Sequence, residues 1–151
     1  MTTLDVAVEE ILDAIVDAIT AATNETGGGL DEVQAVVRGD RARPMPATPA
    51  IWVVPQAAQA TQEEFGGDEA WRMLVSIAAL VKSDSPDTGG RVAQRLSARA
   101  AAIARDARPA GGYVIDVRPD SFDPTARSSE RNRNLFWTDA TVSVWFTVEG
   151  D

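Results

Sequence analysis

The sequence predicts a single α+β domain over residues 1–151, in which a mixed, mostly antiparallel sheet of about four to five strands is flanked by two helices. Three observations lead to this prediction. Two segments have helical hydrophobic periodicity, two long segments alternate between apolar and polar residues, and the order α-β-β-β-α-β-β lacks the regular βα alternation of a doubly wound sheet. With 44% hydrophobic and 25% charged residues, the chain can build one hydrophobic core.

The first helix is expected over residues 3–23. Its apolar side chains recur at helical spacing and share one face: Leu4, Val8, Ile11, Leu12, Ile15 and Ile19. Four acids form a stripe on the opposite face: Asp5, Glu9, Asp13 and Asp17. Thr2 or Thr3 can cap the start of this helix, and the run of glycines at 27–29 ends it.

Three strands are expected before the second helix. They cover residues 33–38, the compact segment 51–54, which Pro55 closes, and the long alternating segment 69–82. A helix competes over 69–82 because of the pair Ala78-Ala79, but the Val and Ile content favours a strand. Residues 39–49 contain three prolines and are expected to form a long loop. The polar, glycine-containing residues 56–68 are expected to form a second loop.

The second helix is expected at about 88–107. Its predicted buried stripe is Val92, Leu96, Ala100 and Ile103, and an arginine row of Arg91, Arg95 and Arg99 runs beside it. A short strand at 113–117 and an alternating strand at 136–148 complete the sheet. The last strand places Ala140, Val142, Val144, Phe146 and Val148 inward, with Trp145 on the opposite face. The charged residues 118–134 between these strands are expected to be a long, structure-poor loop.

The chain lacks histidine and cysteine, so the commonest general base, the commonest nucleophile and most transition-metal ligands are missing. Asp116, Asp120 and Asp123 can in principle hold a hard cation or act as acid and base, but solvated acids are the simpler interpretation. Gly89-Gly90 lacks the spacing and the lysine of a phosphate-binding loop, and the start of a helix explains it better. The sequence therefore predicts a protein that is not an enzyme.

Nearly all of the net charge of −9 lies at the N-terminal end. Residues 1–37 contain eight acids and no base, whereas the rest of the chain contains 15 acids and 14 bases, a net charge of −1. This distribution disfavours DNA binding by the molecule as a whole, because phosphate binding needs clustered Lys and Arg. The N-terminus carries acids in place of the basic start of a signal peptide, and no apolar run has the length of a membrane span. Cytoplasmic synthesis is therefore expected.

Two features suit contacts with other molecules, although packing in the core is the favoured interpretation of the first. Four tryptophans lie on expected strands or at their edges: Trp52, Trp71, Trp137 and Trp145. Because Trp145 faces away from the inward side of its strand, both faces of that strand need covering, by helices or by a partner subunit. The long loops at 39–49 and 118–134 suit arms that become ordered against a neighbour, and flexible loops are equally consistent with the sequence.

Several landmarks of this chain occur together in one known family. They are the opening amphipathic helix, Arg-x-Arg-Pro followed by Pro49-Ala50-Ile51-Trp52-Val53, the long strand Trp71 to Val81, the Ala/Arg helix, and the closing pair Gly112-Tyr113-Val114-Ile115-Asp116 and Phe136-Trp137-Thr138-Asp139-Ala140-Thr141-Val142. Over nearly its whole length the chain resembles the tail terminator (tail completion) proteins of long-tailed, siphovirus-like viruses, the lambda-terminator-like family. The shared motifs are patterns of order and spacing, without catalytic residues.

This resemblance implies a subunit that forms a homohexameric ring on the last ring of the tail tube, stops tube polymerisation and offers the surface for head–tail joining. The implied partners are further copies of the chain, the tail tube protein and the head–tail connector or neck proteins. DNA passes through such a ring without specific binding. The protein would be a virion component of a bacterial or archaeal virus, made in the host cytoplasm, with no cofactor and no membrane contact.

For such a ring, the expected interface residues are the cations of the long loops and the outward tryptophan: Arg41, Arg43, Arg127, Arg131, Arg133 and Trp145. The acids Asp5, Glu9, Asp13 and Asp17 are the candidates for a surface that faces the lumen, because like charge keeps DNA from adhering to a channel wall. Two other functions stay open at this point. One is another neck subunit, such as a head-completion or adaptor protein, and the other is an acidic protein-binding module.

Overall fold

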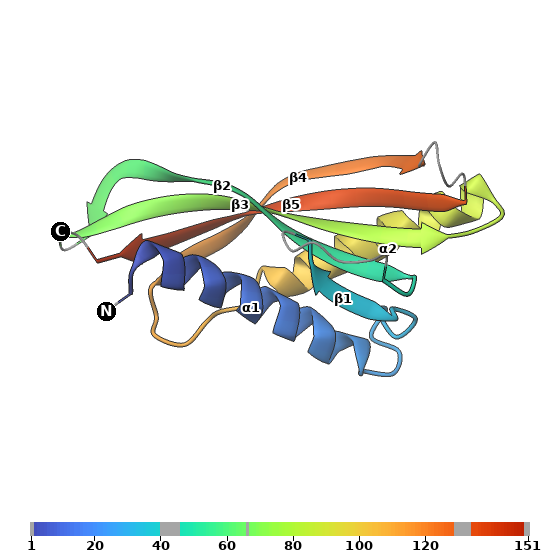
Figure 1. Cartoon of the computed structure of the whole chain (residues 1–151), viewed down its shortest axis with the longest axis horizontal. Coiled ribbons are helices and arrows are strands. Elements are labelled where there is room, and N and C mark those ends of the chain that lie inside the picture. The colour runs from blue at the N-terminus through green and yellow to red at the C-terminus, as the bar shows by residue number, and fades with distance from the viewer. Residues whose placement is uncertain (1, 40–45, 66, 129–133, 150–151) are drawn as a thin grey trace.

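The computed structural model describes residues 2–39, 46–65, 67–128 and 134–149. These residues form two helices and five strands in the predicted order (Figure 1): α1 (Leu4–Thr23), β1 (Ala35–Arg38), β2 (Ala50–Phe65), β3 (Asp68–Lys82), α2 (Pro86–Ala104), β4 (Val114–Ser128) and β5 (Leu135–Val148). The predicted α+β class is confirmed. Neither of the described helices has the length and apolar character needed to cross a membrane.

All five strands belong to one sheet with the order β1-β2-β3-β5-β4. β1 is parallel to β2, and the other neighbouring pairs are antiparallel, so the sheet is mixed and mostly antiparallel, as predicted. The hairpins β2–β3 and β4–β5 turn at opposite ends of the sheet (Figure 1), because β3 and β5 run in opposite directions. β1 and β4 are the edge strands of the sheet.

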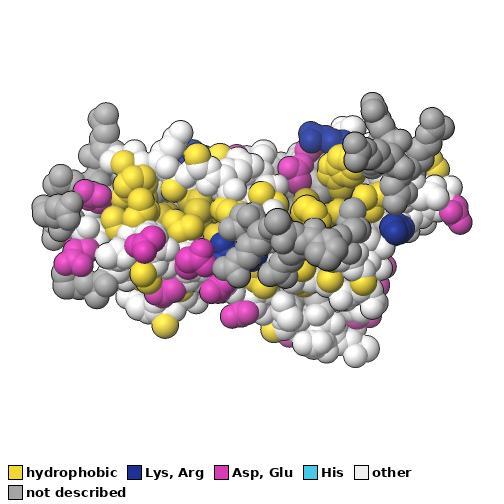
Figure 2. Space-filling model, viewed as in Figure 1, with side chains coloured by type: hydrophobic (Ala, Val, Ile, Leu, Met, Phe, Trp, Pro, Cys, Tyr) yellow, Lys and Arg dark blue, Asp and Glu magenta, His cyan; other side chains and the backbone are white. Residues whose placement is uncertain are grey.

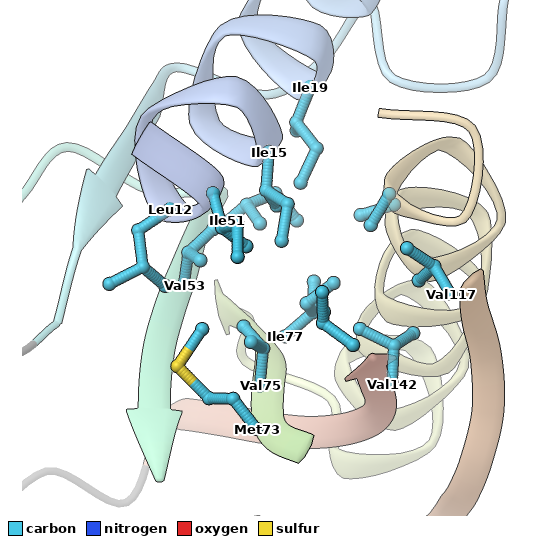
Figure 3. Packing of buried hydrophobic residues seen from close by; sticks show 14 of the residues in the cluster. Leu12, Ile15, Ile19, Ile51, Val53, Met73, Val75, Ile77, Val117 and Val142 are labelled. Atoms are coloured by element: carbon cyan, nitrogen blue, oxygen red, sulfur yellow. The ribbon is translucent and has the colours of Figure 1, made fainter. Parts of the chain in front are cut away.

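Both helices contribute to one hydrophobic core on the same face of the sheet (Figure 3). α1 provides Ile11, Leu12, Ile15 and Ile19 from the face that its periodicity predicted. The strands provide alternate residues, among them Met73, Val75, Ile77, Ala79 and Val81 of β3 and Val142, Val144, Phe146 and Val148 of β5. The periods of 3.6 and 2 in the sequence therefore identified the core face of each of these elements.

Strand β2 continues to Phe65, whereas the sequence predicted that Pro55 ends the strand and that residues 56–68 form a loop. That prediction was wrong over 56–65. The ladder between β2 and β3 has register shifts between Pro55 and Ala58 and between Ala60 and Glu64. Bulges of this kind tolerate a residue without a backbone N–H, and they interrupt the polar–apolar alternation by which a strand is identified.

Strand β4 continues to Ser128, whereas the sequence predicted a structure-poor segment from residue 118 onward. That prediction was wrong over 118–128. β4 pairs with β5 along its length, with register shifts at three places. Charged residues, prolines such as Pro119 and Pro124, and bulges are the usual protection of an edge strand against unwanted pairing, and they look like a loop in a sequence. Residues 129–133 of the predicted loop, and residues 40–45 of the other one, lie outside the described residues.

Helix α2 begins at Pro86 and is capped by Ser85, whose side chain accepts a hydrogen bond from the backbone N–H of Thr88 (3.3 Å). Gly89 and Gly90 lie within its first turns and are buried. A β-carbon at Gly89 would lie 2.6 Å from Cδ2 of Phe136. The glycine pair therefore lets the helix pack closely on the sheet, in agreement with a structural rather than a phosphate-binding role.

The buried face of α2 is rotated slightly from the predicted one. Ala93, Leu96, Ala100 and Ala104 are buried, whereas the predicted Val92 and Ile103 are half-buried at the margin of the core. The arginine row connects α2 to the loop after α1, because Arg99 donates to the carbonyl of Gly28 (3.1 Å) and Arg95 to that of Gly29 (3.2 Å). These two arginines thus hold the glycine-rich turn against the second helix.

Candidate assembly surfaces

The face of the sheet opposite the helices, called the helix-free face below, is lined by alternate residues of β2, β3 and β5. Its large apolar side chains include Trp52, Leu74, Leu80, Trp137 and Trp145. The three tryptophans and Leu74 are half-buried, and Leu80 is 7% exposed. Trp145 lies on this face, as the alternation predicted. A sheet face of this composition is typical of a surface that another protein covers.

Trp145 lies between two arginine side chains. The guanidinium carbons of Arg72 on β3 and Arg118 on β4 are 5.5 and 5.6 Å from the centroid of its indole ring. Arg72 also donates to Oγ of Ser143 (3.1 Å) and forms an ion pair with Asp120 (2.8 Å). A cation–π contact at a partly exposed site contributes about 0.5–1 kcal/mol. The two contacts therefore favour this orientation of the indole ring on the helix-free face.

Each of the three aspartates that the sequence marked as a possible cation site is bonded to an arginine. The pairs are Asp116–Arg118 (2.6 Å), Asp120–Arg72 (2.8 Å) and Asp123–Arg127 (2.7 Å). The hydrogen bond from Arg118 lowers the pKa of Asp116, and the backbone N–H of Thr125 lowers the pKa of Asp123. Among the described residues, no group of three His, Cys, Asp or Glu side chains is placed to hold a metal ion.

Two indole N–H groups on the helix-free face are left without an acceptor. The Nε1 atoms of Trp52 and Trp145 are buried, and neither has a hydrogen-bond partner within the described part of the chain. An unpaired buried donor costs about 1–3 kcal/mol, and native proteins rarely leave one in this state. The face with the largest aromatic side chains therefore also carries polar groups that remain to be satisfied.

The acidic stripe of α1 is exposed, and a buried arginine neutralises part of it. Arg38, at the end of β1, is 5% exposed and forms ion pairs with Glu9 (2.6 Å) and Asp13 (3.5 Å). Both carboxylates remain in contact with water, as do Asp5 and Asp17. Acidic side chains gather over α1 on the face drawn in Figure 2, where basic ones are few. The sequence predicted the stripe but not its cation, because Arg38 lies 29 residues from Glu9.

Tyr113, which precedes β4, contacts α1 through Glu10. Its hydroxyl donates to Oε2 of Glu10 (3.3 Å). Burial of the ring, then the negative charge of Glu10 and the hydrogen bond to it, raises the pKa of Tyr113 to about 12. The neutral phenol is favoured because a phenolate at this position would be partly buried beside a carboxylate.

The tyrosinate absorbance of the folded protein is therefore expected to titrate near pH 12 instead of near pH 10. Because the folded pKa lies above the unfolded one, the contribution of Tyr113 to stability is complete below about pH 10 and is lost as the pH rises towards 12. The chain has one tyrosine, so an ultraviolet titration reports this group alone, with circular dichroism as the check on folding. Glu10→Gln should lower the pKa only in part, because burial remains. A midpoint near 10 in the folded protein would contradict this assignment.

Of the five arginines predicted as interface cations, Arg127 is the one within the described residues, where it lies exposed on β4. The others lie outside the described residues: Arg41, Arg43, Arg131 and Arg133. Arg72 and Arg118, which hold Trp145, were missed by the sequence reasoning. A single arginine on a strand looks solvent-facing in a sequence, and the one available signal was that Arg72 falls on the face of β3 opposite its apolar residues.

The fold can be compared with those of known proteins even though the sequence gives no match. No protein-family model and no curated protein matches this sequence. Among solved structures, a chain of the virion of a native gene transfer agent particle is similar, with a TM-score of 0.55 at 12% sequence identity. The alignment covers 91% of this chain and 98% of that chain. At this identity the likeness shows a shared fold over almost the full length of both chains.

Proposed function

We propose that the protein is a structural component of a virion, and more specifically a tail terminator whose copies form a homohexameric ring at the end of a tail tube. The helix-free face carries this proposal. Three half-buried tryptophans lie on it, together with two buried indole N–H groups that lack an acceptor. A covering subunit would supply the apolar contact that the exposed parts of these rings lack in one chain.

The charges on the helix-free face suit a contact between identical chains. Each chain has a net charge of −9, so copies repel one another at long range. Arg72, Arg118 and Arg127 are each paired with an aspartate at this side of the sheet, so these three pairs add no net charge to it. A second copy can therefore approach this face at a smaller electrostatic cost than it meets over α1.

The fold and the residue inventory support a structural role in a virion. The similar solved chain belongs to a virion, and the likeness extends over 98% of that chain. The sequence contains neither histidine nor cysteine, and the described residues hold no cluster of metal ligands. The proposal therefore includes no cofactor and no catalysed reaction.

In the proposed particle, the ring caps the last ring of the tail tube, stops the addition of tube subunits and presents its other side to the neck of the head. Its partners are the tail tube protein on one side and head–tail connector proteins on the other, and DNA passes through the centre without specific binding. The protein is made in the host cytoplasm and ends in the tail or neck region of the virion. This assignment rests on the family resemblance of the sequence and on the helix-free face, which no helix of the same chain covers.

Light scattering across protein concentration, from low to molar salt, tests the ring. The expected mass is six times the 16.1 kDa of one chain, and negative-stain images should show a ring with a central hole. Trp145→Asp should shift the mass towards the monomer, whereas Asp31→Asn, in the loop after α1, should leave it unchanged. A dimer, or a monomer under every condition, would contradict the ring. A monomer that binds basic proteins through α1 would support an acidic binding module instead.

A further inference from the structure

One tryptophan of the helix-free face has support that the others lack. Trp145 on β5 lies directly opposite Arg72 of β3 in the sheet register, and Arg118 of β4 approaches the same ring, so three neighbouring strands hold one indole. Trp52 and Trp137 lie towards the other end of this face. Within the described part of the chain, neither of these two rings has an arginine or a lysine over it.

The two arginines beside Trp145 are themselves held by other side chains. Arg72 donates from Nε to Oγ of Ser143 (3.1 Å) and from Nη2 to Asp120 (2.8 Å), so two branches of its guanidinium group are bonded at once. Arg118 donates from Nε to Asp116 (2.6 Å). The planar fork of arginine allows such bonds while its flat side stays against an aromatic ring. The bonds therefore restrict the indole ring before any partner covers it.

Arg72 restricts the ring more than Arg118 does. The side chain of Arg72 is 32% exposed, whereas that of Arg118 is 64% exposed. A cation–π contact strengthens as water is removed from it, because water competes with the ring for the cation. Arg72 is also bonded to two side chains and Arg118 to one. Arg72 is therefore the residue whose loss should free the indole ring most.

A restricted ring on a contact surface favours binding. Ordering one mobile side chain at an interface weakens binding about threefold to tenfold, and a ring that is already fixed avoids this loss. Tryptophan and arginine are also the residues that most often dominate the binding energy of protein interfaces. Trp145 is half-buried in one chain, so part of its ring is still open to a partner.

We infer that Trp145 is the energetic centre of the contact between copies on the helix-free face, and that Arg72 is the positioning residue that holds its ring for the partner. This inference rests on the proposed assembly and names the residues that decide its strength. Trp52 and Trp137 lie on the same face without this support, so each contributes less to binding. If the cluster served only the fold of one chain, loss of Arg72 would leave the affinity between copies unchanged.

Single variants test the order of these contributions. Trp145→Ala is expected to raise the dissociation constant of the assembly about thirtyfold or more, and Trp137→Ala less than about tenfold. Arg72→Ala should raise it about threefold to tenfold, because the ring must then be ordered on binding. Arg72→Lys should have a smaller effect than Arg72→Ala, since lysine keeps the charge but lacks the fork that bonds Ser143 and Asp120 together. Analytical ultracentrifugation measures each constant.

Arg91→Ala is the matched control for Arg72→Ala. Arg91 is an exposed arginine of α2 with an aspartate partner of its own, Asp87 (3.3 Å), so its loss changes the net charge by the same amount away from the helix-free face. This variant should keep the affinity of the wild type, and a loss equal to that of Arg72→Ala would mean that net charge is the cause.

A double variant separates positioning from direct contact. Arg72→Ala/Trp145→Ala should assemble as weakly as Trp145→Ala alone, because a positioning residue acts only through the ring that it holds. A further loss in the double variant would mean that Arg72 contacts the partner itself, and it would overturn the positioning role.

The indole ring can be followed directly in the dissociated protein. The nitrogen–proton heteronuclear NOE of an indole N–H reports motion of the ring on the picosecond to nanosecond timescale. Trp145→Phe identifies the signal of Trp145 among those of the four tryptophans. Arg72→Ala should lower this NOE, whereas Arg91→Ala should leave it as in the wild type. An unchanged NOE in Arg72→Ala would overturn the positioning role, whatever the state of assembly.

The outcomes separate the inference from the proposed ring. If the wild type is a hexamer and Trp145→Ala weakens it no more than Trp137→Ala, the energetic centre is overturned while the ring stands. If the wild type forms an oligomer of another size whose affinity follows Trp145 and Arg72 as expected, the inference stands and the hexameric terminator fails. A wild type that is monomeric under every condition overturns the ring and the energetic centre together, and the NOE then decides the positioning role.

Discussion

Replacing Phe146 by alanine is expected to lower the free energy of unfolding by about 3–5 kcal/mol. Phe146 is the largest of the fully buried side chains in the part of the chain that the structure describes. In the sheet register it lies between Trp71 of β3 and Val114 of β4, with its ring in the core beneath the helices. Alanine would leave a cavity that close-packed neighbours fill only in part. Urea denaturation followed by circular dichroism measures the change.

The neighbouring residue provides the control, because Trp145 lies on the other face of the same strand. Trp145→Ala is expected to cost only about 1–2 kcal/mol in the monomer, since the ring is half-buried and the arginine contacts that it would lose are weak. The same substitution should weaken assembly, because the helix-free face is the proposed contact surface. Equal losses of monomer stability for Phe146→Ala and Trp145→Ala would mean that both faces of β5 are equally covered in one chain. That result would contradict the assignment of the core to one face of the sheet.

Gly89→Ala is expected to lower the free energy of unfolding by about 1–3 kcal/mol, although alanine is the better helix former by about 1 kcal/mol. The new β-carbon would lie 2.6 Å from Cδ2 of Phe136 and 3.1 Å from Cβ of Ser83, closer than two carbon atoms pack. Because Phe136 is 6% exposed, its ring has little space into which to move. Chemical denaturation of the wild type and the variant gives the difference.

A second substitution shows whether steric overlap is the cause. Phe136→Leu shortens the side chain that Gly89→Ala would meet, so the double variant should be more stable than the sum of the two single losses predicts. The coupling free energy from this double-mutant cycle is the quantity to measure. Simple additivity would mean that the ring of Phe136 does not oppose a side chain at position 89. A more stable Gly89→Ala variant would mean that helix propensity outweighs packing here.

Three elements were predictable over nearly their whole length because each has one uninterrupted pattern. α1 keeps the helical period from end to end, and β3 and β5 keep the period of two, so both the type of element and its core face follow from local spacing. β2 beyond Pro55 and β4 beyond Val117 were not predictable in this way. Their bulges shift the alternation, and their prolines and charges are also the composition of a loop.

The candidate surfaces also contain some features that local spacing predicts and others that it does not. The outward position of Trp145 and the acidic stripe of α1 follow from spacing along one element. The arginines that hold Trp145 come from β3 and β4, and the arginine that binds the stripe comes from β1. Which strands become neighbours, and in what register, is invisible in the local pattern of any one of them.

By itself, the sequence determined the α+β class, the order of the elements, the core faces of α1, β3 and β5, and the concentration of negative charge on the first helix. These follow from composition and short-range periodicity, which are properties of each segment alone. Only the tertiary structure decided where β2 and β4 end, that Arg38 lies buried beneath Glu9, and that Arg72 and Arg118 enclose Trp145. Each of these depends on contacts between residues far apart in the chain, and such contacts exist only once the sheet has brought those residues together.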